Sequence, residues 1–268
     1  MDFIQSILIA IIEGLTEFLP ISSTAHMIFL SSYFNIAQDE FVKMYQVSIQ
    51  LGAIMAVVVL YWKKFFDFKK IHFYIKLMIA VIPALVLGYL FDDYIETVLE
   101  KPVPIAIVLI LGGIILLFID TYFKNPQIES EEAITYKKAF IIGFWQCLAM
   151  MPGTSRAAAS IIGGMQQKLS RSAAAEFSFF LAVPTMSAVT LYSIFLKKWA
   201  VGDGFLKGYE MILSTPENTK FFIFGNIIAF LVALIAIKGF IEMIKKYGFK
   251  IWGYYRIIVG SLMLLLFL

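Results

Sequence analysis

Charged residues are scarce in this chain. Asp, Glu, Lys and Arg make up 15% of its 268 residues, and hydrophobic residues make up 60%, whereas a soluble domain carries about 25% charged residues. This deficit excludes a soluble protein, even one with a large core. Continuous apolar runs replace the strict alternation that the wall of a β-barrel needs. The composition predicts an all-α integral membrane protein, with residues 1–268 forming a single membrane domain.

Cysteine and basic clusters are also nearly absent. The chain has one cysteine, Cys147, which excludes an intrachain disulfide and a thiolate metal cluster. No basic stripe with interleaved aromatic residues is present, so we expect no nucleic-acid partner. The expected partners are the lipid bilayer and a lipid substrate, and a homodimer is kept as an alternative to a monomer.

Six apolar runs are long enough to cross a bilayer, which takes about 20 helical residues. They are residues 44–62, 73–91, 103–119, 174–196, 221–237 and 251–268. Lys76, Glu176 and Arg256 are placed near the ends of their runs, where long side chains reach the interface or pair. The sequence thus predicts six transmembrane helices.

Two further apolar regions are each divided by a polar break that contains a proline. The first consists of residues 3–12, then EGLTEFLPISSTAH, then 27–30; the second consists of residues 139–151, then MPGTSRAAAS, then 161–165. Irregular backbone at membrane depth is tolerated only where protein or a polar cavity surrounds it. We therefore predict two re-entrant helix-loop-helix hairpins. The alternative for the first region is one full span kinked at Pro20.

The predicted order, a hairpin followed by three spans, occurs twice. Repeat one covers about residues 1–120 and repeat two about 136–268, with Ser23 aligned to Ser155. An odd number of crossings turns the second repeat upside down, giving an inverted-topology repeat. Such repeats place their broken helices together near the bilayer midplane. We expect the two polar breaks to meet there.

The first break carries two acidic residues. Glu13 and Glu17 are four positions apart, so on a helix they lie on one face. Burying an acidic group inside a membrane costs free energy, so such groups usually pair with a partner or take part in chemistry. They suit proton transfer, or the binding of a divalent cation as metal ligands. The alternative is a solvated or salt-bridged pair at the mouth of the hairpin.

Hydroxyl groups and an imidazole follow. Ser22, Ser23, Thr24 and His26 occupy five consecutive positions with Ala25. One hydroxyl is expected to cap a helix N-terminus. The remaining groups match a nucleophile beside a base, although a lone histidine is more often structural.

The second break resembles an anion site. Gly153, Thr154, Ser155 and Arg156 lead into a predicted helix, whose first N–H groups attract anions. The guanidinium of Arg156 matches phosphate oxygens with a fork of donors. Inside a membrane it needs an anionic partner, and Glu17 or a substrate phosphate fits that role. A purely structural ion pair is the alternative.

At these two breaks the chain resembles the undecaprenyl-diphosphate phosphatase family, the bacitracin-resistance phosphatases of bacterial plasma membranes. The resemblance rests on EGLTEFLPISSTAH (13–26) and PGTSR (152–156), and it extends through IQLGAIMAVV (49–58) and VALIAIK (232–238). Ala157 and Ser160 depart from the serine and threonine of the family's second motif. The resemblance implies hydrolysis of the C55 isoprenyl diphosphate to the monophosphate, which recycles the carrier lipid for cell-wall synthesis and confers bacitracin resistance. It also implies a divalent cation, Mg²⁺ or Ca²⁺.

Roles follow for the residues of both breaks. Glu13, Glu17, Ser23, His26 and Arg156 are expected to be catalytic. Ser23 is the candidate nucleophile, with Glu17 or His26 as base; attack by water, or by His26 itself, stays open. The expected substrate-binding residues are Ser22, Thr24, Gly153, Thr154 and Ser155. A secondary transporter is the rival function, because inverted repeats with broken helices are common in transporters.

The Lys and Arg residues in the loops predict the orientation. Loops 63–72, 120–138 and 244–250 carry ten, against six in 1–43, 92–102 and 197–220. Cytoplasmic loops are the richer in these residues, so both termini are expected outside. In a bacterial plasma membrane the active site would then face the periplasmic side.

Overall fold

The computed structural model describes residues 1–99 and 101–267, and the side chains of all of these except residues 92–99. Six segments are long and apolar enough to span a membrane, which confirms the predicted all-α membrane fold. They are α3–α4 (Glu40–Leu60), the first part of α6 (Ile71–Phe91), α7 (Pro102–Tyr122), α10 (Arg171–Phe195), α12 (Pro216–Tyr247) and α13 (Lys250–Phe267). The first of these spans is divided at Ile49 into α3 (Glu40–Ser48) and α4 (Gln50–Leu60), and α6 as a whole covers Ile71–Leu99.

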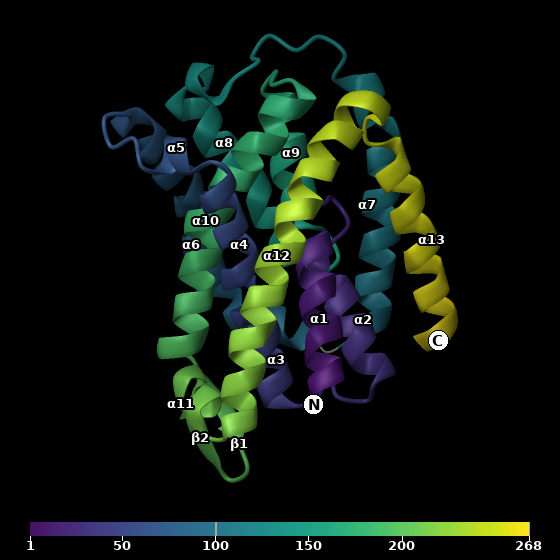
Figure 1. Cartoon of the computed structure of the whole chain (residues 1–268). Helices are drawn as coiled ribbons and strands as arrows, with labels where there is room; N and C mark the ends of the chain where they lie inside the picture. The colour runs from purple at the N-terminus through teal and green to yellow at the C-terminus, as the bar shows by residue number, and fades with distance from the viewer. Residues whose placement is uncertain (100, 268) are drawn as a thin grey trace.

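Shorter elements connect and fill this frame. They are α1 (Phe3–Thr16), α2 (Ser23–Tyr33), α5 (Trp62–Phe65), η1 (Glu131–Ala133), α8 (Tyr136–Gln146), η2 (Cys147–Met150), α9 (Arg156–Gln166) and α11 (Gly208–Leu213). Between α10 and α12 the antiparallel strands β1 (Lys198–Val201) and β2 (Gly204–Lys207) pair, with Lys198 opposite Lys207. This hairpin, where the sequence predicted only a loop, lies with α11 at the end of the molecule that holds the N-terminus (Figure 1).

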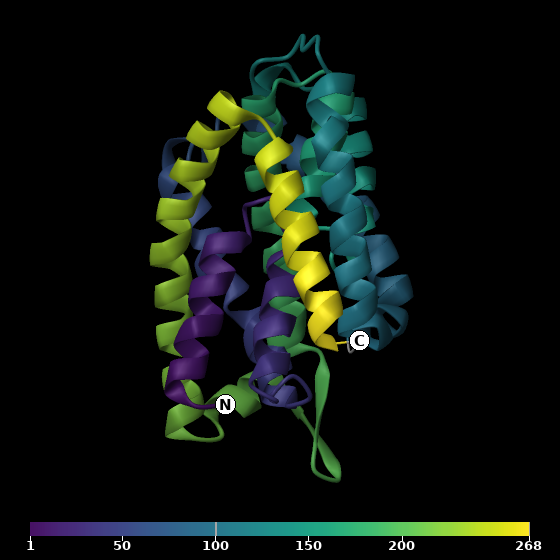
Figure 2. The same ribbon diagram turned by 90° about the vertical axis from the view of Figure 1, so that its right-hand side faces the viewer.

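The two polar breaks separate short helices in opposite halves of the bundle. In Figure 1, α1 and α2 occupy the lower half and α8 and α9 the upper half, and both chain termini lie toward the lower end. Helix α1 packs on α12 and α13 packs on α7 (Figure 2), and α8 packs on α6 and α9. Both predicted helix–break–helix regions are therefore present, and α1 ends before Pro20 rather than continuing through it as a kinked span. Their re-entrant position in a bilayer, the inverted repeat and the single domain stay predictions.

Glycines let some of these helices touch closely. A methyl group added at Gly143 of α8 would lie 2.0 Å from the carbonyl oxygen of Ala80 in α6. At Gly239, on the exposed side of α12, the same group would meet nothing within 4 Å. Close backbone approach at small residues is a main source of helix association in membranes.

The Gly143→Ala variant is therefore expected to lower the free energy of unfolding by about 1–3 kcal/mol, since α6 and α8 must separate to relieve the clash. Unfolding of the purified protein in mixed micelles measures the change. The matched control is Gly239→Ala, which should be neutral or slightly stabilising because alanine favours a helix. Equal stabilities of the two variants would contradict this packing.

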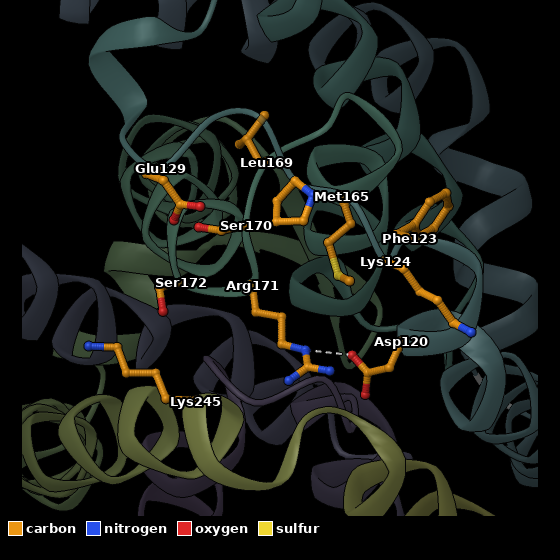
Figure 3. Close-up of a pocket in the computed structure, with 11 residues that line it drawn as sticks. Asp120, Phe123, Lys124, Glu129, Met165, Leu169, Ser170, Arg171, Ser172 and Lys245 are labelled. Carbon is orange, nitrogen blue, oxygen red and sulfur yellow. Dashed lines mark hydrogen bonds and ion pairs between the residues drawn. The ribbon is translucent and has the colours of Figure 1, made fainter.

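At the end of the bundle opposite the chain termini, Arg171 at the start of α10 forms an ion pair with α7. Its Nε lies 2.7 Å from Oδ1 of Asp120 in α7, and Oδ2 of Asp120 accepts the N–H of Phe249 at 2.8 Å. These contacts border a polar hollow of about 440 Å³ (Figure 3). Asp120 therefore joins α7 both to Arg171 of α10 and to the α12–α13 turn.

Candidate active site between the two polar breaks

Helix α1 carries both carboxylates of the first break. It begins with a capping box, in which Asp2 accepts the N–H of Gln5 and Gln5 accepts the N–H of Asp2, both at 2.8 Å. It ends at Thr16, so Glu17 is its C-terminal cap. Glu13 is fully buried. The segment is held close to α12, because a methyl group at Gly14 would lie 2.6 Å from the carbonyl oxygen of Ala229.

Two serines cap the N-termini of the helices that follow the breaks. Ser22 caps α2 and Ser155 caps α9, and their hydroxyl oxygens accept the N–H groups of Ala25 and Ala158 at 3.4 and 3.2 Å. Both have positive φ angles, 70° and 73°, a strained conformation that is concentrated at functional sites.

The equivalence of Ser22 and Ser155 shifts the sequence alignment of the breaks by one residue. Ser23, rather than Ser22, had been aligned with Ser155. The structure instead makes Ser23 and Arg156 equivalent, as the first residues of α2 and α9. Both side chains are directed to the same carboxylate.

That carboxylate belongs to Glu17, which is 7% exposed. One oxygen, Oε1, accepts from Nη2 of Arg156 at 2.9 Å, and the other, Oε2, accepts from the hydroxyl of Ser23. Ser155 adds a link by donating to the carbonyl of Leu19 at 3.4 Å. The expected meeting of the two breaks is thus confirmed, and it joins a hydroxyl, a carboxylate and a guanidinium.

Arg156 is oriented by groups on α10 that the sequence analysis missed. Its Nη1 donates to the carbonyl oxygen of Ser178 at 2.8 Å and to the Ser178 hydroxyl at 3.3 Å. Ser160 donates to the same hydroxyl at 2.7 Å, and the Phe18 ring lies 5.9 Å from the guanidinium carbon. The side chain keeps 12% of its surface exposed. No pattern in SAAAEFSFF distinguishes Ser178 as a partner.

Arg256 was expected near the end of its span, where its side chain would reach the interface or pair, and in the structure it pairs with backbone inside the bundle. Its side chain is fully buried, and all of its acceptors within the described part of the chain are backbone carbonyl oxygens. The acceptors are Pro20 and Thr154 at 3.0 Å, Gly153 at 2.7 Å, Leu109 at 3.0 Å and Val108 at 3.5 Å. Arg256 therefore holds both breaks against α7, and unsatisfied carbonyls explain how a cation is tolerated there.

Glu13 lies one helical turn before Glu17, and its backbone carbonyl accepts the N–H of Glu17 at 3.0 Å. Both of its carboxylate oxygens are buried and have no partner among the described residues. The described part of the chain contains no group of three or more His, Cys, Asp or Glu residues that could enclose a metal. Two carboxylates fit a Mg²⁺ or Ca²⁺ ion that takes its other oxygens from water and a phosphate, as Mg²⁺ usually does.

His26 lies one turn after Ser23 on α2. Its Nδ1 is 2.8 Å from the carbonyl oxygen of Ser22, and its Nε2 is 2.9 Å from the hydroxyl of Tyr255, whose ring stacks on the imidazole. Tyr255 was not identified from the sequence, although it directly precedes Arg256. The catalytic role of His26 stays a prediction.

The other expected substrate-binding residues border this arrangement. Thr24 is half-buried on α2. The turn of the second break passes through Gly153, whose φ is 94° and whose added methyl group would lie 2.5 Å from the carbonyl oxygen of Ile105. Thr154 donates its N–H to Met151 at 3.1 Å. The roles of these residues, with Ser22 and Ser155, stay predictions.

Comparison with known proteins gives one consistent result. The family model described as bacitracin resistance protein BacA matches residues 6–262. An undecaprenyl-diphosphatase of Flavobacterium psychrophilum is 54% identical over 266 residues, covering 99% of this chain and 96% of the relative. The undecaprenyl-diphosphatases of Flavobacterium johnsoniae and Porphyromonas gingivalis are 51% and 47% identical, covering 99% and 100% of this chain and 96% and 98% of those proteins.

Proposed function

The chain belongs to the bacitracin resistance protein BacA family, and from this membership we propose that it is a membrane phosphatase acting on undecaprenyl diphosphate. The products are undecaprenyl phosphate and inorganic phosphate. The single observation that carries the proposal is the Glu17 carboxylate, shared by the Ser23 hydroxyl and the Arg156 guanidinium. Phosphoryl transfer asks a protein mainly for positioning and for stabilisation of charge, and these groups supply both.

Arg156 and the start of α9 bind the diphosphate in this proposal. The guanidinium offers a planar fork to phosphate oxygens, and the first-turn N–H groups of α9 add the positive end of a helix dipole. Ser178 keeps the fork oriented through its two contacts with Nη1. A substrate phosphate would compete with Glu17 for Nη2, which frees the carboxylate as an acceptor of a proton.

Ser23 is the proposed nucleophile. Its hydroxyl already donates to Glu17, so the carboxylate is placed to take the proton as Oγ attacks the terminal phosphorus. The anhydride P–O bond breaks, and undecaprenyl phosphate leaves with that bond's electrons. Water then cleaves the phosphoserine and releases inorganic phosphate. His26 is less suited to attack, because both ring nitrogens face hydrogen-bonding partners.

A divalent cation is proposed between Glu13 and Glu17. When bound, Mg²⁺ or Ca²⁺ would neutralise charge on the phosphates and on the leaving group. The partnerless oxygens of Glu13 support this assignment. We expect EDTA to abolish phosphate release and either ion to restore it. The measurement is the rate of release after dialysis and re-addition; undiminished activity in EDTA would leave Glu13 without this role.

The proposed cellular role is recycling of the carrier lipid for cell-wall synthesis, with bacitracin resistance as a consequence. The proposed location is the bacterial plasma membrane, with the site accessible from the periplasmic side. The Lys-rich loops after α4, after α7 and between α12 and α13 lie at the end of the bundle opposite both termini (Figure 1). This distribution supports termini outside the cell.

Phosphate release from C55 diphosphate by the purified full chain in detergent tests the function. We expect Ser23→Ala to lower the rate by about 10³-fold, because the nucleophile is lost. Ser6→Ala is the matched control, since Ser6 is also buried in the first hairpin, and its hydroxyl, the group that alanine removes, donates to the carbonyl of Phe3 on the same helix. His26→Ala should lose less than Ser23→Ala.

Each of these outcomes separates two readings of the site. No phosphate release by the wild-type protein would favour a transporter. Release by Ser23→Ala at the wild-type rate would replace the serine with direct attack by water. A larger loss in His26→Ala than in Ser23→Ala would instead make the imidazole the nucleophile.

A further inference from the structure

An apolar groove of about 350 Å³ lies between the first hairpin and the C-terminal helix. Its walls include Ile12 of α1, Phe29 and Leu30 of α2, and Val259 and Met263 of α13. Side chains of α2 and α13 face each other across it, and the rings of Phe29 and Phe267 stack 6.4 Å apart.

The groove begins beside the candidate active site. His26 lines the groove. Its two ring nitrogens form hydrogen bonds with the Ser22 carbonyl and the Tyr255 hydroxyl. Ser23 and His26 are three positions apart, so they are neighbours on one face of α2. Leu30 continues that face by one more turn. The same surface of α2 thus passes from the Ser23 hydroxyl into the groove.

The facing surface of α13 has the same helical spacing. Tyr255, Val259 and Met263 are each four positions apart, which places them in one row along the helix. From Val259 to Phe267 the helix rises by about 12 Å. The row leads from the stacked Tyr255 ring toward the end of α13, away from Glu17.

We propose that this groove binds the first isoprene units of the polyprenyl chain, next to the diphosphate. The inference rests on the proposed phosphatase function. Because the chain is covalently joined to the phosphates, a diphosphate held at Arg156 must direct its first carbons along an apolar path out of the break. The groove provides such a path. Its volume of about 350 Å³ is that of a pocket for a small molecule, so it accommodates a short segment of the chain and not the whole C55 chain.

The groove acts through orientation more than through affinity. Lipid tails are as apolar as the groove, so the polyprenyl chain gains little from the hydrophobic effect when it moves from the bilayer into the groove. Close packing against the groove walls therefore determines how well the chain is held. A well-packed first segment fixes the direction of the diphosphate at Ser23, which raises the rate of transfer. A phospholipid chain in the groove would not be held in this way, because its headgroup does not occupy the break and so does not tether the chain to the site.

Phosphate release from a series of isoprenyl diphosphates tests the groove. In the wild-type protein, kcat/KM should rise from the C5 to the C20 substrate as the groove fills. The Met263→Trp variant fills the groove with a side chain, and it should lower the ratio of kcat/KM for C20 to that for C5 about tenfold. Leu265→Trp is the matched control, because Leu265 is 80% exposed on the same helix and does not line the groove; its ratio should stay at the wild-type value.

An unchanged ratio in both Met263→Trp and Val259→Trp, each recovered as folded protein by gel filtration, would overturn the proposal. A binding experiment decides independently of turnover. A photoreactive C15 diphosphate should label α13 peptides that contain Val259 and Met263, and C20 diphosphate should displace it. Equal displacement by phosphatidylglycerol would identify a general lipid groove and overturn the proposal. If no isoprenyl diphosphate is hydrolysed, the phosphatase function fails, and this labelling still determines what the groove binds.

Discussion

Replacing Arg156 with lysine is expected to lower kcat/KM for undecaprenyl diphosphate by about 10²–10³-fold, the usual cost of losing one preorganised donor to a developing charge. Lysine keeps the positive charge, so the loss would come from geometry. Arginine places Nη1 on Ser178 at 2.8 Å and Nη2 on Glu17 at 2.9 Å, and the one nitrogen of lysine cannot keep both contacts in this planar geometry. A point charge also binds phosphate without the planar fork of arginine. Steady-state phosphate release measures the change.

A double-mutant cycle with Glu17 separates this explanation from a general loss of structure. Glu17→Gln should cost about as much as Ser23→Ala, since it removes the proton acceptor. The double variant Glu17→Gln, Arg156→Lys should lose far less than the product of the two single losses, because residues that act as a unit are not additive. Fully multiplicative losses, or wild-type turnover in Arg156→Lys, would contradict the proposed site.

The sequence predicted the two breaks because their residue types are improbable in a membrane. Glu17 and Arg156 are costly inside hydrocarbon without partners, so each implied the other, and the structure joins them at 2.9 Å. The six spans were predictable for a similar reason, because length and hydropathy alone constrain a helix that must satisfy its own backbone. Only the division of the first span at Ile49 has no signal in the apolar pattern.

Contacts to the backbone were beyond prediction, because any residue has a carbonyl group. Arg256 has no acidic partner among the described side chains, and its acceptors come from three separate segments of the chain. Ser178 likewise uses its own carbonyl to hold Arg156. Ser22 and Ser155 share positive φ angles of 70° and 73°, so the one-residue shift between the two breaks appears only in three dimensions.

Replacing Arg256 with methionine is expected to destabilise the fold by about 3–5 kcal/mol. Methionine fills much of the space but leaves the carbonyls of Pro20, Gly153, Thr154 and two residues of α7 without their donor. A hydrogen bond between membrane helices contributes on average about 0.6 kcal/mol, and a buried acceptor left unpaired costs about 1–3 kcal/mol. Five bonds at the lower value set the lower limit, and partial rearrangement keeps the total below the sum of the higher ones.

Activity should fall together with stability, because Pro20 and Gly153 position the two breaks that hold Ser23 and Arg156. Arg256→Lys should be intermediate in both respects, since an ammonium has three donors for carbonyls that now receive five bonds. Lys250→Met is the matched control, as Lys250 is the exposed first residue of the same helix. Thermal unfolding in detergent, measured beside phosphate release, checks the expectation. If Arg256→Met unfolded at the same temperature as Lys250→Met, these carbonyl contacts would contribute nothing to the fold, and the guanidinium could not be what holds the breaks in place.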